Sequence, residues 1–529
     1  MRQLCPCHAD WQGLRVRSGL YSTARGSKFA AERHRSTVPK RNTNQSRQVF
    51  PCGQTRREFV WEMGGGFSGL ALASLLGADG FFARQAQALG QVAVSPLQPR
   101  SSNYFGKAKH CIFLMMNGGP SQVDTFDYKP ELQKHANKSL PQDKKYINSG
   151  GRRVGFLTPN WRPFRPGGQS GLLVSDYFPN VRRHADKLAV LKACHADSHA
   201  HGSALVAMNT GSTFIGRPSL GAWSVYGLGT ENQSLPGYVV MLDKRGGPIS
   251  GQPNWSSGFM PSTFQGTLFR PSGNPILDLE GPAHLDARAQ RRQLDLLAKL
   301  NQKHLDERPG GQELAARIQS YELAYRMQAE APEAVDLSRE KQATRDMYGI
   351  GQQPTDEYGR NCLIARRLVE RGVRFIQLYS GGGHLEDTWD GHESIEKNHG
   401  LHGAEVDQPI AALLTDLEQR GLLDSTLVVW GGEFGRMPFS EGKGAPGRNH
   451  NPYGFCMWMA GGGVKGGMSY GETDEFGFEA VVNKTHVHDI HATILHLMGI
   501  DHEALSYFHQ GRKETLTDVH GRIIREICA

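Results

Sequence analysis

The chain has 529 residues, of which 38% are hydrophobic, and a formal net charge of +8. This size is enough for one large domain with insertions or for two ordinary domains. Residues 1–88 hold 13 of the 60 basic residues but 5 of the 52 acidic ones, so the rest carries 47 of each sign and is formally neutral. We therefore expect no nucleic-acid partner, because the excess positive charge is confined to the N-terminal segment.

Residues 55–88 have the features of a twin-arginine signal peptide. Thr55–Val60 (TRREFV) contains the arginine pair, Gly64–Leu76 is a short, weakly apolar stretch, and Ala86–Ala88 (AQA) resembles a cleavage site. The alternative is a chance arginine pair before a buried helix. The pattern predicts the twin-arginine translocase as a partner and a periplasmic or otherwise exported protein. Residues 1–54 lack apolar periodicity, which favours a disordered extension or a misassigned translation start.

The cysteines and the hydropathy exclude two further classes of protein. Five cysteines follow the leader, and they are scattered, odd in number and without a CxxC pair: Cys111, Cys194, Cys362, Cys456 and Cys528. We expect neither a disulfide framework nor a cysteine zinc site. No apolar run reaches the roughly 18 residues of a membrane-spanning helix, so we expect no stable membrane span.

Three apolar runs of strand length each end in glycines. They are Cys111–Met116, Val373–Tyr379 and Thr426–Trp430. Continuous apolar runs of this length are typical of strands that are buried on both faces. Between the second and third runs, apolar residues recur at helical spacing over 406–417. A strand, a helix and a strand in this order predict a right-handed parallel crossover.

The segment from about 285 to 345 has a different pattern, with two helical stripes of apolar residues. It predicts a helical insertion or lid. We find no internal repeat and no long low-complexity linker. The chain from residue 89 to 529 is therefore predicted to be one α/β domain, with a predominantly parallel sheet flanked by helices and a helical insertion.

Polar side chains gather just after the three apolar runs. They are Ser121, Asp124 and Asp127 after the first run, His384, Asp387, Asp390 and His392 after the second, and Glu433, Arg436 and His450 after the third. Ligands of open α/β sheets bind outside the carboxyl ends of the strands, so these side chains are expected to converge. Carboxylates with neutral imidazoles predict a divalent metal, with zinc favoured and manganese, calcium or magnesium also compatible. For any single histidine the alternative is a hydrogen-bonded structural side chain.

Two further clusters carry weaker signals. The C-terminal histidines His486, His488, His491 and His496 lie around a helix whose other residues are apolar. Metal ligation and a packing or capping role both remain open for them. The glycine-rich segment Gly461–Gly467 lacks the spacing of a phosphate-binding loop and is interpreted as a surface turn.

Five motifs in order resemble the exported bacterial family known as domain of unknown function 1501. They are Gly118–Asp127, Trp389–His392, Gly432–Arg436, Gly447–His450 and Asp489–Leu495. The resemblance extends from about residue 109 to the C-terminus. That family is considered similar to the alkaline phosphatase and sulfatase superfamily. The resemblance implies an alkaline phosphatase-like fold and metal-dependent hydrolysis of phosphate or sulfate esters.

The resemblance also implies roles for individual residues. Asp390 and His392 look like the superfamily's aspartate-histidine metal pair, and His450 looks like the later metal histidine. Asp124 would be the early carboxylate ligand. Glu433 stands where an Asp-His pair would follow a strand.

The chain departs from the superfamily at the nucleophile. Counting back nine residues from Thr210, at the end of the corresponding helix, leads to His201, and Ser198 and Ser203 flank it out of register. Glu433 is likewise not followed by histidine. Three roles stay open for His201, as nucleophile, general base or metal ligand, and the site could also have lost catalysis.

The leading hypothesis is an exported metal-dependent hydrolase that acts on a small-molecule or polysaccharide ester of phosphate or sulfate. His201 and Arg436 are the expected catalytic residues, with Arg436 clamping an anionic oxygen by a bidentate contact. The alternative for Arg436 is a surface salt bridge. The alternative function is a non-catalytic exported binding or scaffold protein that retains the fold.

Overall fold

A nine-stranded sheet organises the computed structural model, which describes residues 96–140, 154–270, 275–277, 279–281, 284–307 and 312–529. Its strands are β1 (His110–Met116), β5 (Leu188–His195), β6 (Tyr238–Met241), β7 (Thr267–Leu268), β8 (Phe375–Ser380), β9 (Thr426–Gly431), β13 (Phe455–Ala460), β14 (Met468–Tyr470) and β17 (Thr485–His486). Their order is β14-β5-β13-β9-β1-β8-β6-β7, and β17 also pairs with β5.

The sheet is predominantly parallel. β1 pairs in parallel with both β8 and β9, and β6 continues the parallel series beyond β8. β13 is the exception among the nine strands described for this sheet, because it runs antiparallel to its neighbours β5 and β9. The predicted α/β class with a mostly parallel sheet is therefore confirmed.

The three apolar runs form β1, β8 and β9 in the centre of this sheet. Alternate residues of β1 belong to two hydrophobic cores, with Ile112 and Leu114 in one and Cys111 and Phe113 in the other. A strand that is apolar at every position is thus buried on both faces, as its sequence predicts. The chain passes from β8 through a long helix to the parallel strand β9, on the other side of β1.

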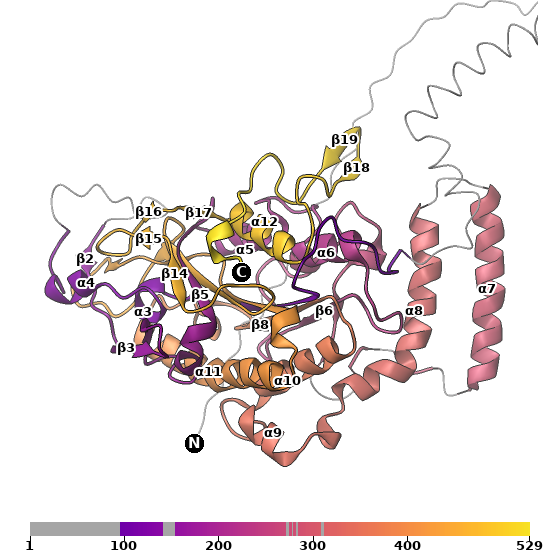
Figure 1. Cartoon of the computed structure of the whole chain (residues 1–529), viewed down its shortest axis with the longest axis horizontal. Coiled ribbons are helices and arrows are strands. Elements are labelled where there is room, and N and C mark those ends of the chain that lie inside the picture. The colour runs from indigo at the N-terminus through magenta and orange to yellow at the C-terminus, as the bar shows by residue number, and fades with distance from the viewer. Residues whose placement is uncertain (1–95, 141–153, 271–274, 278, 282–283, 308–311) are drawn as a thin grey trace, which may run out of the picture. The chain divides into compact units, whose positions relative to one another are not determined.

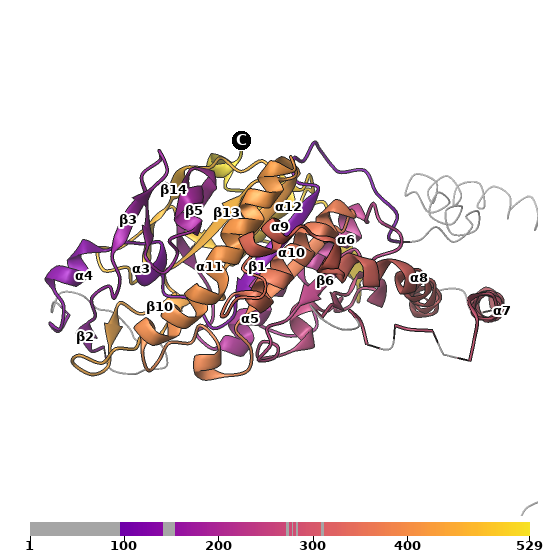
Figure 2. The same cartoon turned by 90° about the horizontal axis from the view of Figure 1, so that it is seen from below.

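Helices cover both faces of the sheet (Figures 1 and 2). One core is shared with α10 (Asp356–Glu370) and α11 (Ile395–Gln419), which lie side by side (Figure 2). The other core is shared with α5 (His201–Thr210), α6 (Leu220–Leu228) and α12 (Val487–Leu497). The apolar residues at helical spacing over 406–417 lie on α11 and pack in the first core.

The predicted helical insertion contains α7 (Ala287–Glu307), α8 (Gln312–Val335) and α9 (Gln342–Met347). The remaining short elements are α3 (Gln122–Thr125), α4 (Pro130–Lys134), β2 (Phe156–Leu157), β3 (Phe164–Gly167), β4 (Leu172–Ser175), β10 (Gly435–Arg436), β11 (Phe439–Ser440), β12 (His450–Asn451), β15 (Glu472–Thr473), β16 (Ala480–Val482), β18 (Tyr507–His509) and β19 (Arg512–Glu514).

The expected leader at 55–88 and the extension at 1–54 lie outside the described residues. Within the described part of the chain, none of the helices combines the length and the apolar character that crossing a bilayer requires.

Candidate metal centre

Loops at the carboxyl edge of the parallel strands bring the candidate site together. Gly118 follows β1, His201 follows β5 as the first residue of α5, Asp390 follows β8, and Glu433 follows β9. His450 lies on the short strand β12. The expected convergence at strand ends therefore occurs, although not every predicted residue takes part in it.

Three imidazole rings surround the carboxylate of Asp390. Its Oδ1 lies 3.0 Å from Nε2 of His392 and 3.1 Å from Nε2 of His450, and its Oδ2 lies 3.3 Å from Nε2 of His201. The Nε2 atoms of His392 and His450 are 2.8 Å apart. Ligand atoms of His201, Asp390 and His450 all lie within 4.8 Å of one another. Three groups of the kinds that bind divalent metals thus share one small volume, and His392 lies against two of them.

Contacts on the far side of two rings determine which nitrogen faces Asp390. Nδ1 of His450 donates to the carbonyl of His199 at 2.7 Å, which leaves its Nε2 as an acceptor. Nδ1 of His201 contacts Oε1 of Glu433, also at 2.7 Å. Nε2 of His201 is buried and forms no hydrogen bond with any described residue, since its contact with Asp390 lacks hydrogen-bond geometry. Metal-binding histidines are commonly held in this way.

Burial and neighbouring charges shift the pKa values of Asp390, His450 and His201. Burial raises the pKa of Asp390, but Arg436 and the three histidines outweigh it and hold that pKa far below its usual range. Burial lowers the pKa of His450 to about 3, so its ring is neutral. Burial also lowers the pKa of His201, but its contacts with Asp390 and Glu433 outweigh this effect and raise it overall. The ionised Asp390 and the neutral His450 fit a divalent cation, whereas a metal at His201 would have to displace a proton from its ring.

Glu433 holds His201 instead of joining the ligand atoms. Its fully buried carboxylate accepts the backbone N–H of Gly118 at 3.0 Å and contacts Nδ1 of His201. Gly118 has a φ of 111°, and a Cβ there would lie 2.6 Å from Oγ1 of Thr388, so a larger residue does not fit this turn. The expected ligand role of Glu433 does not fit this geometry, because His201 lies between Glu433 and Asp390.

Arg436 is a buried anchor for Asp390. Its NH2 group donates to Oδ1 of Asp390 at 2.5 Å and to the carbonyl of Gly118, and its Nε donates to the carbonyl of Gly119 at 2.9 Å. The side chain has an exposed fraction of 0%. These donors are used inside the protein and the side chain is not exposed to solvent, so the geometry favours an anchoring role over the expected clamp on a substrate oxygen.

Asp124 also lies outside the group of ligand atoms. Its carboxylate accepts from Nε of Arg448 at 2.7 Å and from Oγ of Ser121 at 2.6 Å, and both charged side chains are fully buried. Asp127 is likewise engaged elsewhere, with Lys129 at 3.3 Å. Arg448 was not among the site residues predicted from the sequence. The signal for it was available, because a buried carboxylate needs a cationic partner and Arg448 stands in a motif already singled out.

A cavity of about 880 Å³ opens beside the four groups. The cavity is lined by His384, which is exposed, and by the acidic residues Glu386, Asp387, Glu393 and Glu441. Arg448 is the sole lysine or arginine among the described lining residues, and it is paired with Asp124. The rim of the cavity is therefore acidic, and His384 and Asp387 belong to it without joining the group around Asp390.

Hydroxyl groups are scarce in this cavity. Among the described lining residues, Ser440 is the single one with a hydroxyl, and its Oγ donates to the carbonyl of Gly442 at 2.8 Å. Ser198 and Ser203 share a hydrogen bond of 2.6 Å with each other and do not line the cavity.

The C-terminal histidines cap a helix. Nε2 of His488 donates to the carbonyl of Gly211, and Nε2 of His491 donates to the carbonyl of Met208, both at 2.7 Å. These carbonyls belong to the end of α5, where intrahelical donors run out. Of the two interpretations left open by the sequence, the structure shows the capping role for His488 and His491.

The chain matches a known family over most of its length. The match is to the family described as protein of unknown function (DUF1501), and it covers residues 108–528. The chain belongs to the DUF1501 family. No curated protein matches it.

Solved structures similar to this DUF1501 protein include three enzymes. A lipoteichoic acid synthase from Listeria monocytogenes has a TM-score of 0.35 and 10% identity, with 79% of this chain and 78% of that chain covered. A sulfatase from Pseudoalteromonas sp. has a TM-score of 0.33 and 15% identity, with 78% and 72% covered. The TAB5 alkaline phosphatase has a TM-score of 0.31 and 9% identity, with 74% and 98% covered. At these scores the similarities carry no argument about function.

Proposed function

We propose that this DUF1501 protein is an exported, metal-dependent hydrolase of phosphate or sulfate esters. The observation that supports the proposal most is the convergence of three imidazole Nε2 atoms on Asp390 beside an open cavity of about 880 Å³. Nitrogen ligands with one carboxylate favour zinc and are also compatible with manganese. Calcium and magnesium prefer oxygen ligands and fit this set less well.

The metal would be held by His201, Asp390, His392 and His450. The buried Nε2 of His201, which has no hydrogen-bond partner among the described residues, supports this assignment. When bound, a divalent metal supplies a Lewis acid that polarises an ester oxygen. Glu433 then orients His201, and the carbonyl of His199 orients His450, so both rings keep Nε2 directed at the same point.

The charge of the cavity limits the substrate. Its rim is acidic, and its single arginine, Arg448, is already paired with Asp124. An ester with several negative charges would therefore meet repulsion outside the metal position. A small-molecule or polysaccharide ester with one anionic group fits this cavity best.

The attacking group is best assigned to water. Both ring nitrogens of His201 are directed at carboxylates, which favours the ligand role over the nucleophile role. The hydroxyl of Ser440 donates to a neighbouring carbonyl. This arrangement supports single-step hydrolysis over a covalent intermediate.

A second function is supported by the scarcity of hydroxyl and cationic groups in the cavity. Among the described lining residues, neither an uncommitted hydroxyl nor an unpaired lysine or arginine faces the cavity. A non-catalytic exported protein that uses the metal to bind a polysaccharide or an envelope component would need neither group.

Both functions require a bound divalent metal, and metal analysis of the purified full-length chain tests this requirement. We expect about one divalent ion per chain, and we expect His392→Ala to lose it while the control His384→Ala, on the rim of the same cavity, retains it. A metal content near zero after expression in zinc- and manganese-supplemented medium would contradict both functions.

Activity assays then separate the two functions. We expect hydrolysis of aryl phosphate monoesters, phosphate diesters or aryl sulfates by the metal-loaded chain, with no activity in His392→Ala. A metal-loaded protein that hydrolyses none of the three classes supports the binding protein.

A further inference from the structure

Helix α7 packs against the body of the protein through one side only. After Ala289 and Gln290 in its first turn, the half-buried residues of α7 recur at alternating spacings of three and four: Arg291, Leu294, Ala298, Asn301 and Leu305. This spacing marks one seam along the helix, as in a coiled coil. The seam faces α8, and Figures 1 and 2 both show α8 between α7 and the sheet.

Helices α7 and α8 form a hairpin, and a second set of its apolar side chains is exposed to solvent. Leu296 and Leu300 are 59% and 57% exposed, and at 100° per residue they point away from the α8 seam. Leu297 and Tyr321, 36% and 44% exposed, extend the set toward α8. We call these four residues the hairpin patch. Single exposed leucines are ordinary, but four large exposed apolar side chains on one helical hairpin are typical of an interaction surface.

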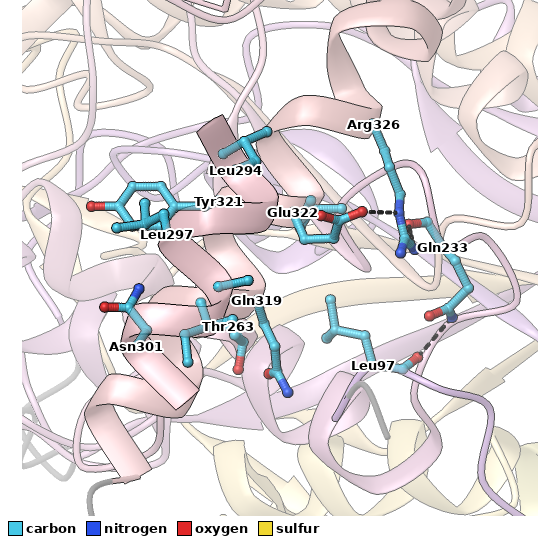
Figure 3. Close-up of a pocket in the computed structure, with 13 residues that line it drawn as sticks. Leu97, Gln233, Thr263, Leu294, Leu297, Asn301, Gln319, Tyr321, Glu322 and Arg326 are labelled. Carbon is cyan, nitrogen blue, oxygen red and sulfur yellow. Dashed lines mark hydrogen bonds and ion pairs between the residues drawn. The ribbon is translucent and has the colours of Figure 1, made fainter. Parts of the chain in front are cut away.

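Two residues of the hairpin patch, Leu297 and Tyr321, line a small pocket between α7 and α8 (Figure 3). The pocket has a volume of about 210 Å³, and Leu294, Leu297 and Tyr321 form part of its wall. Leu97 and Thr263 also line it. Pockets of this kind receive protruding side chains at protein interfaces.

The outermost charges of α7 run against its own helix dipole, although Lys303 and His304 also lie near its end. Arg288 and Arg292 lie near its start, and Asp306 and Glu307 lie at its end. A helix is stabilised by the opposite arrangement, with acidic residues first and basic residues last. None of these four side chains forms an ion pair with another described residue. An antiparallel helix with the same charge pattern would complement both ends at once.

We infer that two copies of this chain associate through an antiparallel, two-fold pairing of their α7 helices. The middle of Ala287–Glu307 is Leu297, and a two-fold axis one residue further, at the level of Ala298, places Leu296 against Leu300 of the partner subunit. The basic start of each helix then lies beside the acidic end of the other. The surface is self-complementary, as a two-fold interface requires.

A membrane surface is the alternative partner for the hairpin patch, since amphipathic helices also bind lipid bilayers. Anionic lipids attract basic residues and repel acidic ones. The acidic end of α7 opposes such binding, whereas it favours pairing with a second copy. Vesicle binding is therefore an outcome that would contradict the inference.

Sedimentation velocity of the full-length chain tests whether the hairpin patch mediates dimer formation. We expect the wild type to be a dimer that dissociates on dilution, and the double variant Leu296→Asp and Leu300→Asp to remain a monomer. The control is Phe508→Asp with Val519→Asp, which changes two side chains that are 70% and 82% exposed elsewhere. The control should dimerise like the wild type, and all three proteins should show the same thermal unfolding.

Charge reversal tests the antiparallel arrangement. Arg288→Glu with Arg292→Glu should weaken the dimer roughly ten-fold, because each altered end then meets acidic residues of the partner. Adding Asp306→Lys and Glu307→Lys to the same chain should restore the dimer. Both changes improve the match to the helix dipole, so loss of folding cannot explain the first effect.

Three results would overturn the inference. They are a wild type that is monomeric at every concentration, a double aspartate variant that still dimerises, and a charge-reversed pair that fails to restore the dimer. A monomer that sediments with anionic phosphatidylserine vesicles through the hairpin patch would assign the surface to a membrane instead. None of these outcomes depends on the proposed hydrolase activity.

Discussion

Oε1 of Glu433 lies 2.7 Å from Nδ1 of His201, and the same carboxylate accepts the N–H of Gly118. Three strand ends are joined by this contact, since Gly118 follows β1, His201 follows β5, and Glu433 follows β9. The contact leaves Nε2 of His201 to face Asp390. Glu433 is therefore a positioning residue for the candidate metal centre.

Glu433→Gln tests this positioning role. The substitution removes the negative charge that supports His201, so metal affinity should fall by about 10- to 100-fold while the fold persists. A competition titration with a chromogenic zinc chelator measures the affinity. The control Glu393→Gln, at an exposed acidic residue of the rim, should bind metal like the wild type. Equal affinities for the two variants would remove Glu433 from the centre.

Asp124→Asn separates a structural pair from a metal ligand. The substitution leaves Arg448 buried without its charged partner, which should lower the free energy of unfolding by about 3–5 kcal/mol. Metal content should stay unchanged in the folded variant, whereas Asp390→Asn should lose the metal. Urea unfolding and elemental analysis give the two readouts. A folded Asp124→Asn protein without metal would restore Asp124 as a ligand.

Arg436→Lys tests whether this arginine anchors Asp390. A lysine cannot replace the fork of donors that reaches Asp390 and two backbone carbonyls, so the free energy of unfolding should fall by about 3–5 kcal/mol. The control is Arg165→Lys, at a side chain that is 61% exposed, and it should change stability little. Normal stability combined with a raised KM would instead identify Arg436 as a substrate clamp.

Because His491 is buried, we expect the free energy of unfolding to fall in acid. Burial lowers its pKa to about 3, while the unfolded chain has the ordinary value of 6.5. Between these values the unfolded state binds a proton at His491 and the folded state does not. The free energy of unfolding is therefore unaffected by this group above pH 6.5 and falls as the pH drops toward 3. The loss for this group is about 1.4 kcal/mol per pH unit.

The substitution His491→Gln tests this sensitivity. Glutamine keeps a donor for the carbonyl of Met208 but does not titrate, so the variant should lose less stability between pH 6.5 and pH 4.5. Urea unfolding at several pH values measures the slope. The control His304→Gln, at an exposed residue of α7, should keep the wild-type slope. An unchanged slope in His491→Gln would mean that other groups dominate acid unfolding.

Export is predicted to depend on the arginine pair of the leader. Replacing Arg56 and Arg57 with lysine should leave the precursor in the cytoplasm, because the translocase reads the paired arginines. Cell fractionation with immunodetection measures this. The matched control replaces Arg47 and Arg84 with lysine and should be exported normally. Secretion of the first variant, or export in a strain without the translocase, would contradict the prediction.

Much of the fold could be predicted from the sequence, because the strands of this sheet are buried on both faces. Such strands appear as continuous apolar runs, and β1, β8 and β9 were found in this way. Strand β5 was missed, since Leu188–His195 includes a lysine and a histidine and has no glycine turn after it. Apolar content alone does not reveal the order of strands across the sheet.

The site was predicted only in part, because residue type does not state which partner a side chain takes. Asp390, His392, His450 and His201 lie together. Glu433 instead accepts from Gly118, Arg436 donates to Asp390, and Asp124 pairs with Arg448. A buried carboxylate is equally well served by a metal or by an arginine. Only the three-dimensional arrangement separates the two.

The reversed direction of β13 has a consequence for locating ligands in such chains. In a strand that runs with its neighbours, the residues that reach the ligand edge come after the strand. Because β13 runs the other way, with Phe455 beside Cys194 near the end of β5, the residues that reach this edge come before it. His450 is placed five positions upstream for this reason. A scan for site residues should therefore look downstream of each parallel strand and upstream of each reversed one.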